Sequence, residues 1–197
     1  MTHTRTWIAV PVTVAALLAG GCGSGATGAA GAAGGPASAS ESNPLGDIPD
    51  DQVYVVHASP DGRFSVQVPE GWARTDLPDG VSFTDKLNTV TVQELTDRPQ
   101  PTPDSARADE LAVVTDGLAD VAIGGVTAMA LPSGPALHPT WSADSAPDPV
   151  TGRTLRDDVE TFVFWRDGTE VLLTLSGPQG ADNVDPWRQI SQSFAWA

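Results

Sequence analysis

Few side chains in this 197-residue chain could perform chemistry at neutral pH, because it has one cysteine and three histidines. A hydrolytic serine triad would have to use His57 or His138 as its base. The Gly-x-Ser-x-Gly elbow that carries the nucleophile of α/β-hydrolases is absent from the sequence. Both histidines are therefore interpreted as surface or hydrogen-bonded structural residues, and no catalytic residue is predicted.

Acidic side chains occur in adjacent pairs, at Asp109-Glu110 and at Asp157-Asp158. Neighbouring residues do not face each other on a helix, and they point to opposite sides of a strand. Neither pair is therefore expected to form the carboxylate dyad of a glycoside hydrolase. Two carboxylates from segments distant in sequence could still form the active site of a glycoside hydrolase. This enzyme is the least favoured alternative.

Oxygen ligands for calcium could come from residues 144–148 or from the run Asp182-Asn183-Val184-Asp185. Neither segment has the twelve-residue spacing of an EF-hand loop. Capping of a helix explains the second segment equally well. The sequence therefore predicts no metal ion and no other cofactor, with structural calcium as the open alternative.

The chain is strongly acidic, with 25 Asp and Glu against 10 Lys and Arg and a formal net charge of −15. Phosphate backbones and anionic bilayer surfaces repel such a protein. Nucleic acid is therefore excluded as a partner, and the domain is expected to stand away from anionic headgroups.

Tryptophan is the most distinctive residue type for recognition, and the chain has six. Trp165 and Trp187 are expected to pack in the core or at its rim. Trp141 differs because it follows Leu137-His138-Pro139-Thr140 and borders a polar, proline-rich loop, residues 142–152. Trp141 and His138 are the residues predicted to contribute to a ligand-binding surface.

The N-terminus has the layout of a secretory signal, with Arg5 followed by the apolar residues 7–18. This run is too short for a permanent membrane span. It ends in Leu18-Ala19-Gly20-Gly21-Cys22, which resembles the lipobox of bacterial lipoproteins. The resemblance implies cleavage before Cys22, a diacylglycerol on its thiol, and anchoring at the outer face of the bacterial cytoplasmic membrane. A secreted protein without lipid is the alternative.

Composition divides the chain into three parts. Residues 1–21 are the signal peptide, and residues 22–51 are the lipidated cysteine and a linker. The linker is rich in Gly, Ala and Ser and cannot bury enough apolar surface to offset its ordering entropy, so it is predicted to be disordered. Residues 52–197 are predicted to form a single domain.

Strands dominate the predicted domain. Turns of the form Pro-acid-Gly recur at nine-residue spacing at residues 60, 69 and 78. Strands are expected at residues 53–57, 63–68, 72–75, 81–84, 88–95, 121–123 and 126–131, and in a short run ending at Trp141. An Asp167-Gly168 turn joins residues 158–165 to 169–175 and predicts that Phe164 pairs with Val171 and Phe162 with Leu173. Both faces of this hairpin are apolar, which indicates a central position.

Two helices complete the expected fold. Thr102 is the predicted N-cap of a helix over residues 103–116, with Gly117 near its end. Asp182 or Asp185 is expected to cap a short helix containing Pro186, and residues 194–196 form an edge or extended segment. Two helices with seven to nine mostly antiparallel strands predict an α+β sandwich.

The motif Phe64-Ser65-Val66-Gln67-Val68-Pro69-Glu70-Gly71-Trp72, together with residues 182–196, resembles the PsbP-like fold, which also occurs in actinobacterial lipoproteins of the LpqN type. The resemblance implies a binding or assembly module over about residues 52–197. It implies no activity and assigns no ligand residue.

The favoured function is a lipid-anchored, non-enzymatic module that binds an envelope protein or another envelope molecule. The alternative is a carrier of small apolar molecules, with a pocket between the sheet and a helix. A cavity of a few hundred Å³ is the structural requirement of that carrier. A hydrolase is the third and least favoured function.

Overall fold

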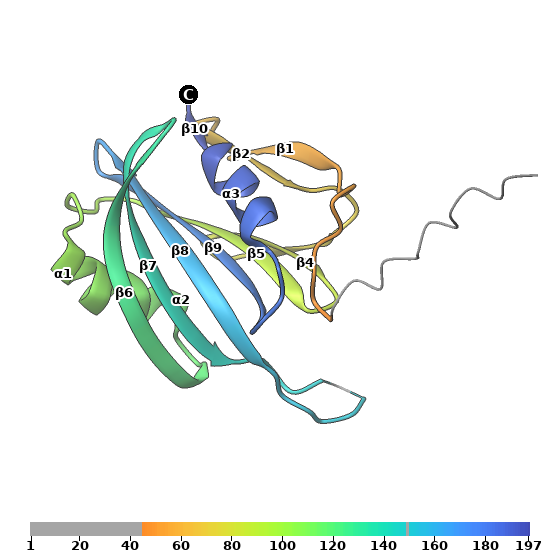
Figure 1. Ribbon diagram of the computed structural model, residues 1–197. Helices are drawn as coiled ribbons and strands as arrows, with labels where there is room; N and C mark the ends of the chain where they lie inside the picture. Colours follow the sequence, from red (N-terminus) through yellow and green to blue (C-terminus); the bar gives the residue numbers. More distant parts are fainter. Residues whose placement is uncertain (1–44, 149) are drawn as a thin grey trace, which may run out of the picture. The chain divides into compact units, whose positions relative to one another are not determined.

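The structure, a computed structural model, describes residues 45–148 and 150–197, which form two antiparallel sheets (Figure 1). The larger sheet has seven strands, with β9 in the middle and β8 beside it. In spatial order the strands are β3 (Ala73–Leu77), β4 (Gly80–Asp85), β5 (Asn88–Leu95), β9 (Thr169–Pro178), β8 (Arg156–Arg166), β7 (Gly134–Asp144) and β6 (Ala119–Leu131).

The smaller sheet contains β1 (Tyr54–Ala58), β2 (Phe64–Pro69) and β10 (Ala195–Trp196), in the order β1-β2-β10. This sheet and helix α3 (Val184–Gln192) lie on one side of the large sheet (Figure 1). On the other side lies a continuous helical segment made of α1 (Pro103–Ser105), the π-helical turn η1 (Ala106–Glu110) and α2 (Leu111–Val114). The predicted α+β fold with mostly antiparallel strands and two helices is confirmed.

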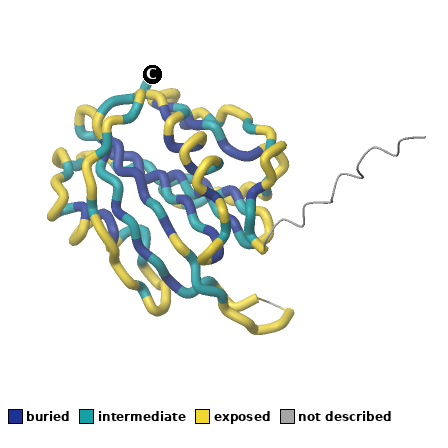
Figure 2. The backbone as a smooth tube through the Cα atoms, viewed as in Figure 1, coloured by how far each residue is buried: buried dark blue, intermediate teal, exposed yellow. Residues whose placement is uncertain are grey.

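Two cores lie on opposite faces of the large sheet. Strand β8 contributes Phe162 and Phe164 to the main core, which also contains the buried residues of β2, α3 and Phe194. It contributes Val159 to a second core with Leu111 and Trp141. Successive residues of a strand point to opposite faces. Val159 is an odd number of positions away from Phe162 and Phe164, so it lies on the other face of the sheet. Buried residues are concentrated in the central strands of the large sheet (Figure 2).

The β8–β9 hairpin has the predicted register, in which Phe164 pairs with Val171 and Phe162 with Leu173. Asp167 and Gly168 both have positive φ, at 51° and 85°. This backbone matches the right-handed twist of the flanking strands, which is why an Asp-Gly pair is favoured there. The hairpin is central, as the apolar residues on both of its faces indicate.

The N-terminus of the helical segment was predicted correctly. Thr102 Oγ1 accepts from the Ser105 backbone N–H at 3.1 Å, and Ser105 Oγ accepts from the Thr102 N–H at 2.9 Å. Pro103 occupies the first turn, where its missing N–H needs no partner. The segment ends at Val114, before the predicted residue 116, and a π turn interrupts it. Gly117, with φ 74°, follows its end.

Strands β6 and β7 are longer than the strands predicted there. The two short strands expected at residues 121–123 and 126–131 form one strand, because the sheet accommodates Gly124-Gly125 as an irregularity between Ile123 and Val126. The short run expected to end at Trp141 is an eleven-residue strand that contains two prolines.

The cap of α3 also differs from the prediction. Asn183 occupies the N-cap position in place of Asp182 or Asp185, and its side chain makes no capping hydrogen bond. The amide instead accepts from the Ile48 N–H at 2.8 Å and donates to Asn88 Oδ1 at 2.9 Å. Tertiary partners therefore take precedence over the local cap.

Residues 45–51, assigned to the linker by composition, pack against the domain. Ile48 is 4% exposed and belongs to the main core. The Gly46 carbonyl accepts from Asn88 Nδ2 at 2.8 Å, and the Asp47 carboxylate accepts from the Asp182 N–H at 2.9 Å. The predicted signal peptide, Cys22 and the remainder of the linker lie outside the described residues. Within the described part of the chain, no helix is long and apolar enough to cross a membrane.

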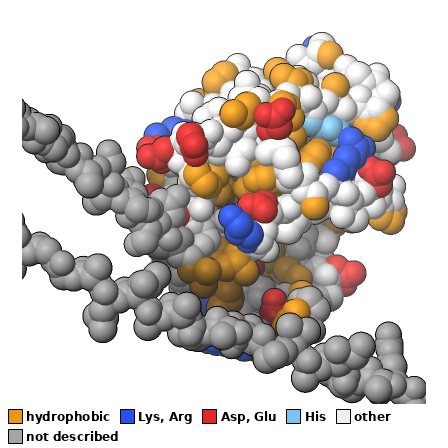
Figure 3. Space-filling model, turned by 90° about the vertical axis from the view of Figure 1, so that its right-hand side faces the viewer, with side chains coloured by type: hydrophobic (Ala, Val, Ile, Leu, Met, Phe, Trp, Pro, Cys, Tyr) orange, Lys and Arg blue, Asp and Glu red, His pale blue; other side chains and the backbone are white. Residues whose placement is uncertain are grey.

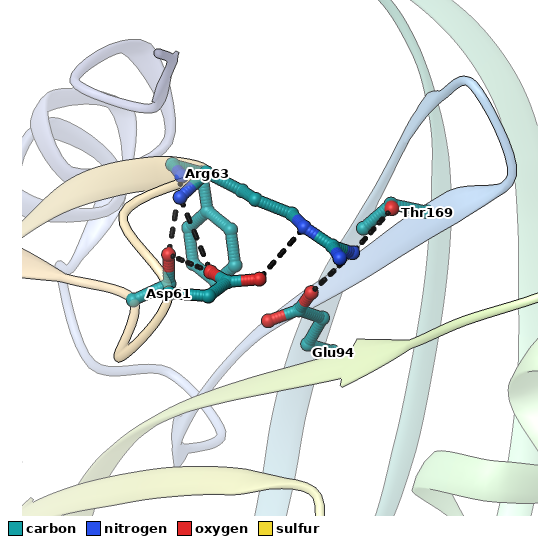
Figure 4. Close-up of polar contacts among 6 residues, drawn as sticks. Asp61, Arg63, Glu94 and Thr169 are labelled. Carbon is teal, nitrogen blue, oxygen red and sulfur yellow. Dashed lines mark hydrogen bonds and ion pairs between the residues drawn. The ribbon is translucent and has the colours of Figure 1, made fainter.

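Arg63 links the two sheets through polar contacts (Figure 4). Its Nε lies 2.7 Å from Asp61 Oδ2 in the turn before β2. Its Nη1 lies 3.3 Å from Glu94 Oε1 on β5 and donates to Thr169 Oγ1 on β9 at 3.0 Å. The half-exposed guanidinium thus connects the small sheet to two strands of the large one.

Candidate functional site

His138 and Trp141, the predicted ligand-binding residues, lie on opposite faces of β7. His138 stacks on Phe162 with 4.6 Å between ring centroids, and its Nε2 lies 3.0 Å from Glu160 Oε2. Trp141 is 6% exposed and donates from Nε1 to Thr161 Oγ1 at 3.1 Å. Three positions separate them on a strand, so the structure does not bring them into one site.

The remaining candidate base, His57, lies on β1 away from both. Its ring packs edge-on against Phe83, with 5.4 Å between centroids. Burial, and then the charge of Arg74, lower the pKa of His57. The two candidate histidines therefore occupy separate packed environments.

A groove of about 460 Å³ lies between the large sheet, the end of α2 and the loop after β7. We call it the helix-side groove. Its apolar lining includes Leu87, Val114, Leu118, Trp141, Ala143 and Val159, with Leu155 from the loop. Of these residues, the sequence pattern indicated only Trp141 as a ligand-binding residue, because the others come from separate segments of the chain.

A row of hydroxyl groups forms the sheet side of the helix-side groove. Thr89 and Thr91 of β5 pair in register with Ser176 and Thr174 of β9, and all four line the groove. The alternation in β5 explains this arrangement, because Val90 and Val92 point into the main core and leave the threonines on the opposite face. The Thr174 hydroxyl lies 3.2 Å from that of Thr161, which accepts from Trp141.

Asp157 also lines this groove. No other described residue makes a hydrogen bond or an ion pair with its carboxylate. Burial, followed by the charges of Asp158 and Asp144, raises the pKa of Asp157 to about 6. Its neighbour Asp158 lines a different groove, of about 410 Å³, which α3 borders on the other face of the sheet. The two carboxylates therefore point to opposite sides, as predicted, and form no dyad.

Two other acids line the helix-side groove, and both have partners. Asp144 Oδ1 lies 3.2 Å from Arg156 Nη1. Asp148 Oδ1 accepts from the Thr151 N–H at 2.7 Å and from the Thr151 hydroxyl at 2.8 Å. These hydrogen bonds lower the pKa of Asp148. Asp148 therefore stabilises its own loop.

A second acidic cluster, formed by Glu110 of η1 and Glu170 of β9, is buried. Glu110 and Glu170 are 3% and 0% exposed, and Arg98 contacts both. Arg98 Nη2 lies 3.0 Å from Glu110 Oε1, and its Nε lies 3.6 Å from Glu170 Oε1. This cluster was not predicted from the sequence, although a glutamate within a central apolar strand is itself a signal of a buried carboxyl.

The helix-side groove has a chemically mixed lining. Its lining offers apolar surface, hydroxyls, carboxylates and the ammonium group of Lys86, with no histidine or cysteine among the described residues. Across residues 45–148 and 150–197, no three His, Cys, Asp or Glu side chains are grouped as metal ligands. The visible part of the face in Figure 3 shows hydrophobic side chains interspersed with acidic and basic ones, without a large patch of one charge.

No protein-family model matches the chain, and no curated protein sequence matches it. Several solved structures are similar. The yeast Ran-binding protein Mog1p of Saccharomyces cerevisiae has 10% identity, covers 74% of this chain and 96% of its own, and has a TM-score of 0.47. LpqN of Mycobacterium tuberculosis, involved in cell envelope biogenesis, has 14% identity, 74% and 91% coverage, and a TM-score of 0.41.

The cyanobacterial PsbP protein CyanoP of Synechocystis sp. PCC 6803 is more similar in structure. It has 15% identity to this chain and a TM-score of 0.53. The match covers 79% of this chain and 100% of CyanoP. The chain therefore has the PsbP-like α+β fold that its sequence resembles.

Proposed function

We propose that this protein is a lipid-anchored, non-enzymatic binding module of the bacterial cell envelope, and that its helix-side groove holds a small, largely apolar molecule. The observation that carries the proposal is the groove itself. Its volume of about 460 Å³ falls within the range of small-molecule sites. A carrier of apolar envelope molecules requires a cavity of a few hundred Å³, so the size of the groove supports the proposal.

The walls of the groove support an apolar ligand with a few hydrogen-bonding groups. Val159 and Trp141 belong to a buried core and offer a rigid apolar floor. Thr89, Thr91 and Ser176 add hydroxyls along one side. Ligand sites typically combine a mainly apolar surface with a small number of fixed polar groups.

A groove-filling substitution tests the binding role. Thr91→Trp is expected to reduce the recovery of co-purifying small molecules at least several-fold, because the indole occupies groove volume. The full chain is isolated from its native envelope, and the extracted lipids and small molecules are quantified by mass spectrometry. Thr127→Trp is the matched control, because Thr127 is exposed on β6 outside the groove. Equal recovery from both variants would contradict the proposal.

Lipid anchoring rests on Cys22 and the small residues before it. Cys22→Ala is expected to abolish fatty-acid labelling and retention in the membrane fraction, because two or more acyl chains are needed for firm anchoring. Ser24→Ala, which leaves the cysteine intact, is the control and is expected to retain both. Unchanged membrane retention of Cys22→Ala would overturn the anchor.

An envelope protein is the second candidate partner. Strand β6 supports it, because this outer strand is mostly exposed and residues 121–131 carry no charge. Unpaired edges of this kind can accept another strand. A photo-crosslinker at Thr127 tests this candidate, and the absence of a crosslinked protein in the native envelope would count against it.

A further inference from the structure

The carboxylate of Asp157, which has no partner among the described residues, gives the helix-side groove a preference for positively charged ligands. Asp157 lines the groove and receives no hydrogen bond from the other described residues, whereas the carboxylates of Asp144 and Asp148 each have partners. Its charge is partly removed from water without a compensating cation. A ligand that supplies one positive charge would complete this site.

The charged groups around Asp157 come from several elements. Asp158, next in β8, points to the other face and accepts from Gln179 at 3.1 Å. Asp144 of β7 is paired with Arg156, and the β9 residue opposite Asp157 is Pro178. Lys86, on the turn between β4 and β5, also lines the groove, but it is 81% exposed and lies 3.7 Å from Asp85.

The surroundings of Asp157 therefore combine negative charge with apolar surface. Leu155, Val159 and Trp141 line the same groove. A groove with walls of low dielectric constant strengthens the field of the acids within it. An anion would be repelled by this field, and a neutral apolar molecule would leave the carboxylate unpaired.

We propose that the helix-side groove selects small amphiphilic cations, whose ammonium group pairs with the Asp157 carboxylate while the hydrocarbon part lies on Trp141 and Val159. The inference rests on the proposed function, because it names the class of ligand for the same groove. The ligand is held by non-covalent contacts alone. The raised pKa of Asp157 adds a measurable consequence: near pH 6 the cation displaces a proton from the carboxyl group.

The test compares three probes of equal chain length: hexylammonium, hexanol and hexanoate. The full chain is placed in phosphatidylcholine nanodiscs, and heats of binding are measured by titration calorimetry after subtraction of empty nanodiscs. At pH 7.5 hexylammonium is expected to bind about tenfold more tightly than hexanol, and hexanoate more weakly than hexanol. The preference for the cation should fall as the pH drops below about 6, as Asp157 becomes protonated.

Two neighbouring variants locate the effect. In Asp157→Asn the affinities for hexylammonium and hexanol are expected to agree within about twofold, because a neutral amide forms no ion pair. In Asp158→Asn, which removes the same charge from the opposite face, the preference should persist.

Equal binding of hexylammonium and hexanol to the unmodified chain would overturn the inference while leaving the groove as an apolar site. A preference that persists in Asp157→Asn would also overturn it. Failure of all three probes to bind would overturn the inference and the proposed function together.

Discussion

Ionisation of the Glu170 carboxyl group opposes folding. It is fully buried on the central strand β9, and neither of its carboxyl oxygens has a hydrogen-bond partner among the described residues. Glu110 lies in the same cluster, so two carboxyls share the single guanidinium of Arg98. Burial, and then the charge of Glu110, raise the pKa of Glu170 from 4.5 to about 7.

This shift predicts the pH dependence of stability. Because the folded protein holds the Glu170 proton more firmly than the unfolded chain, stability is lost as the pH rises from about 4.5 through about 7. Glu170→Gln removes the ionisation and should raise the free energy of unfolding at pH 8 by roughly 1–3 kcal/mol. At pH 4.5 the variant and the unmodified protein should agree. Urea unfolding at both pH values measures the difference.

The control for Glu170→Gln is Glu70→Gln, which alters an exposed carboxyl on the turn after β2. Its free energy of unfolding should differ from that of the unmodified protein by less than about 0.5 kcal/mol at either pH. If Glu170→Gln lost stability at pH 8, the carboxylate would be a net stabilising partner of Arg98, and the direction of the pKa shift would be contradicted.

At the scale of elements, local sequence determined some features well. Asp167-Gly168 indicated both the turn and the register of β8 and β9, because the required positive φ values depend on two adjacent residues. Thr102 likewise indicated where the helical segment begins. Such features depend on neighbours in sequence, so a single sequence contains the necessary information.

Other elements depend on partners that are distant in sequence. The continuity of β6 rests on its pairing with β7, and the amide of Asn183 is occupied by Ile48 and Asn88 rather than by its own helix. The helix-side groove combines residues from β5, β7, β8, β9 and α2. Trp141 was identified from its place beside a polar loop, whereas Asp157 gains its significance only from tertiary burial.

The irregularity in β6 gives a prediction at the element scale. A Cβ on Gly124 would lie 2.9 Å from the Thr140 carbonyl oxygen of β7, whereas a Cβ on Gly125 would meet nothing within 4 Å. Gly124→Ala should therefore lower the free energy of unfolding by about 1–3 kcal/mol, because β7 must shift. Gly125→Ala is the matched control, with an expected change within about 0.5 kcal/mol. Similar losses in urea unfolding of the two variants would contradict this contact.

At the scale of the whole domain, segments far apart in sequence are joined by a buried amide pair. Asn183 precedes α3, and Asn88 begins β5. Their side chains hydrogen-bond to each other and both donate to the Gly46 carbonyl, at 3.1 and 2.8 Å. The N–H of Ile48 donates to the same Asn183 side chain. These contacts hold residues 46–48 against the main core, although these residues were predicted to belong to the linker.

Asn183→Ala should therefore release this segment. Loss of three hydrogen bonds in a buried region is expected to lower the free energy of unfolding by about 2–4 kcal/mol, because Asn88 Oδ1 and the Ile48 N–H lose their partner. Hydrogen exchange of the Ile48 amide should accelerate more than that of the β8–β9 hairpin. Asp182→Ala is the control, because the hydrogen bond from Asp182 to the segment uses its backbone N–H, which the substitution retains. Unchanged protection of Ile48 in Asn183→Ala would show that apolar burial alone retains residues 46–48, and the amide pair would then contribute little to the N-terminal boundary of the domain.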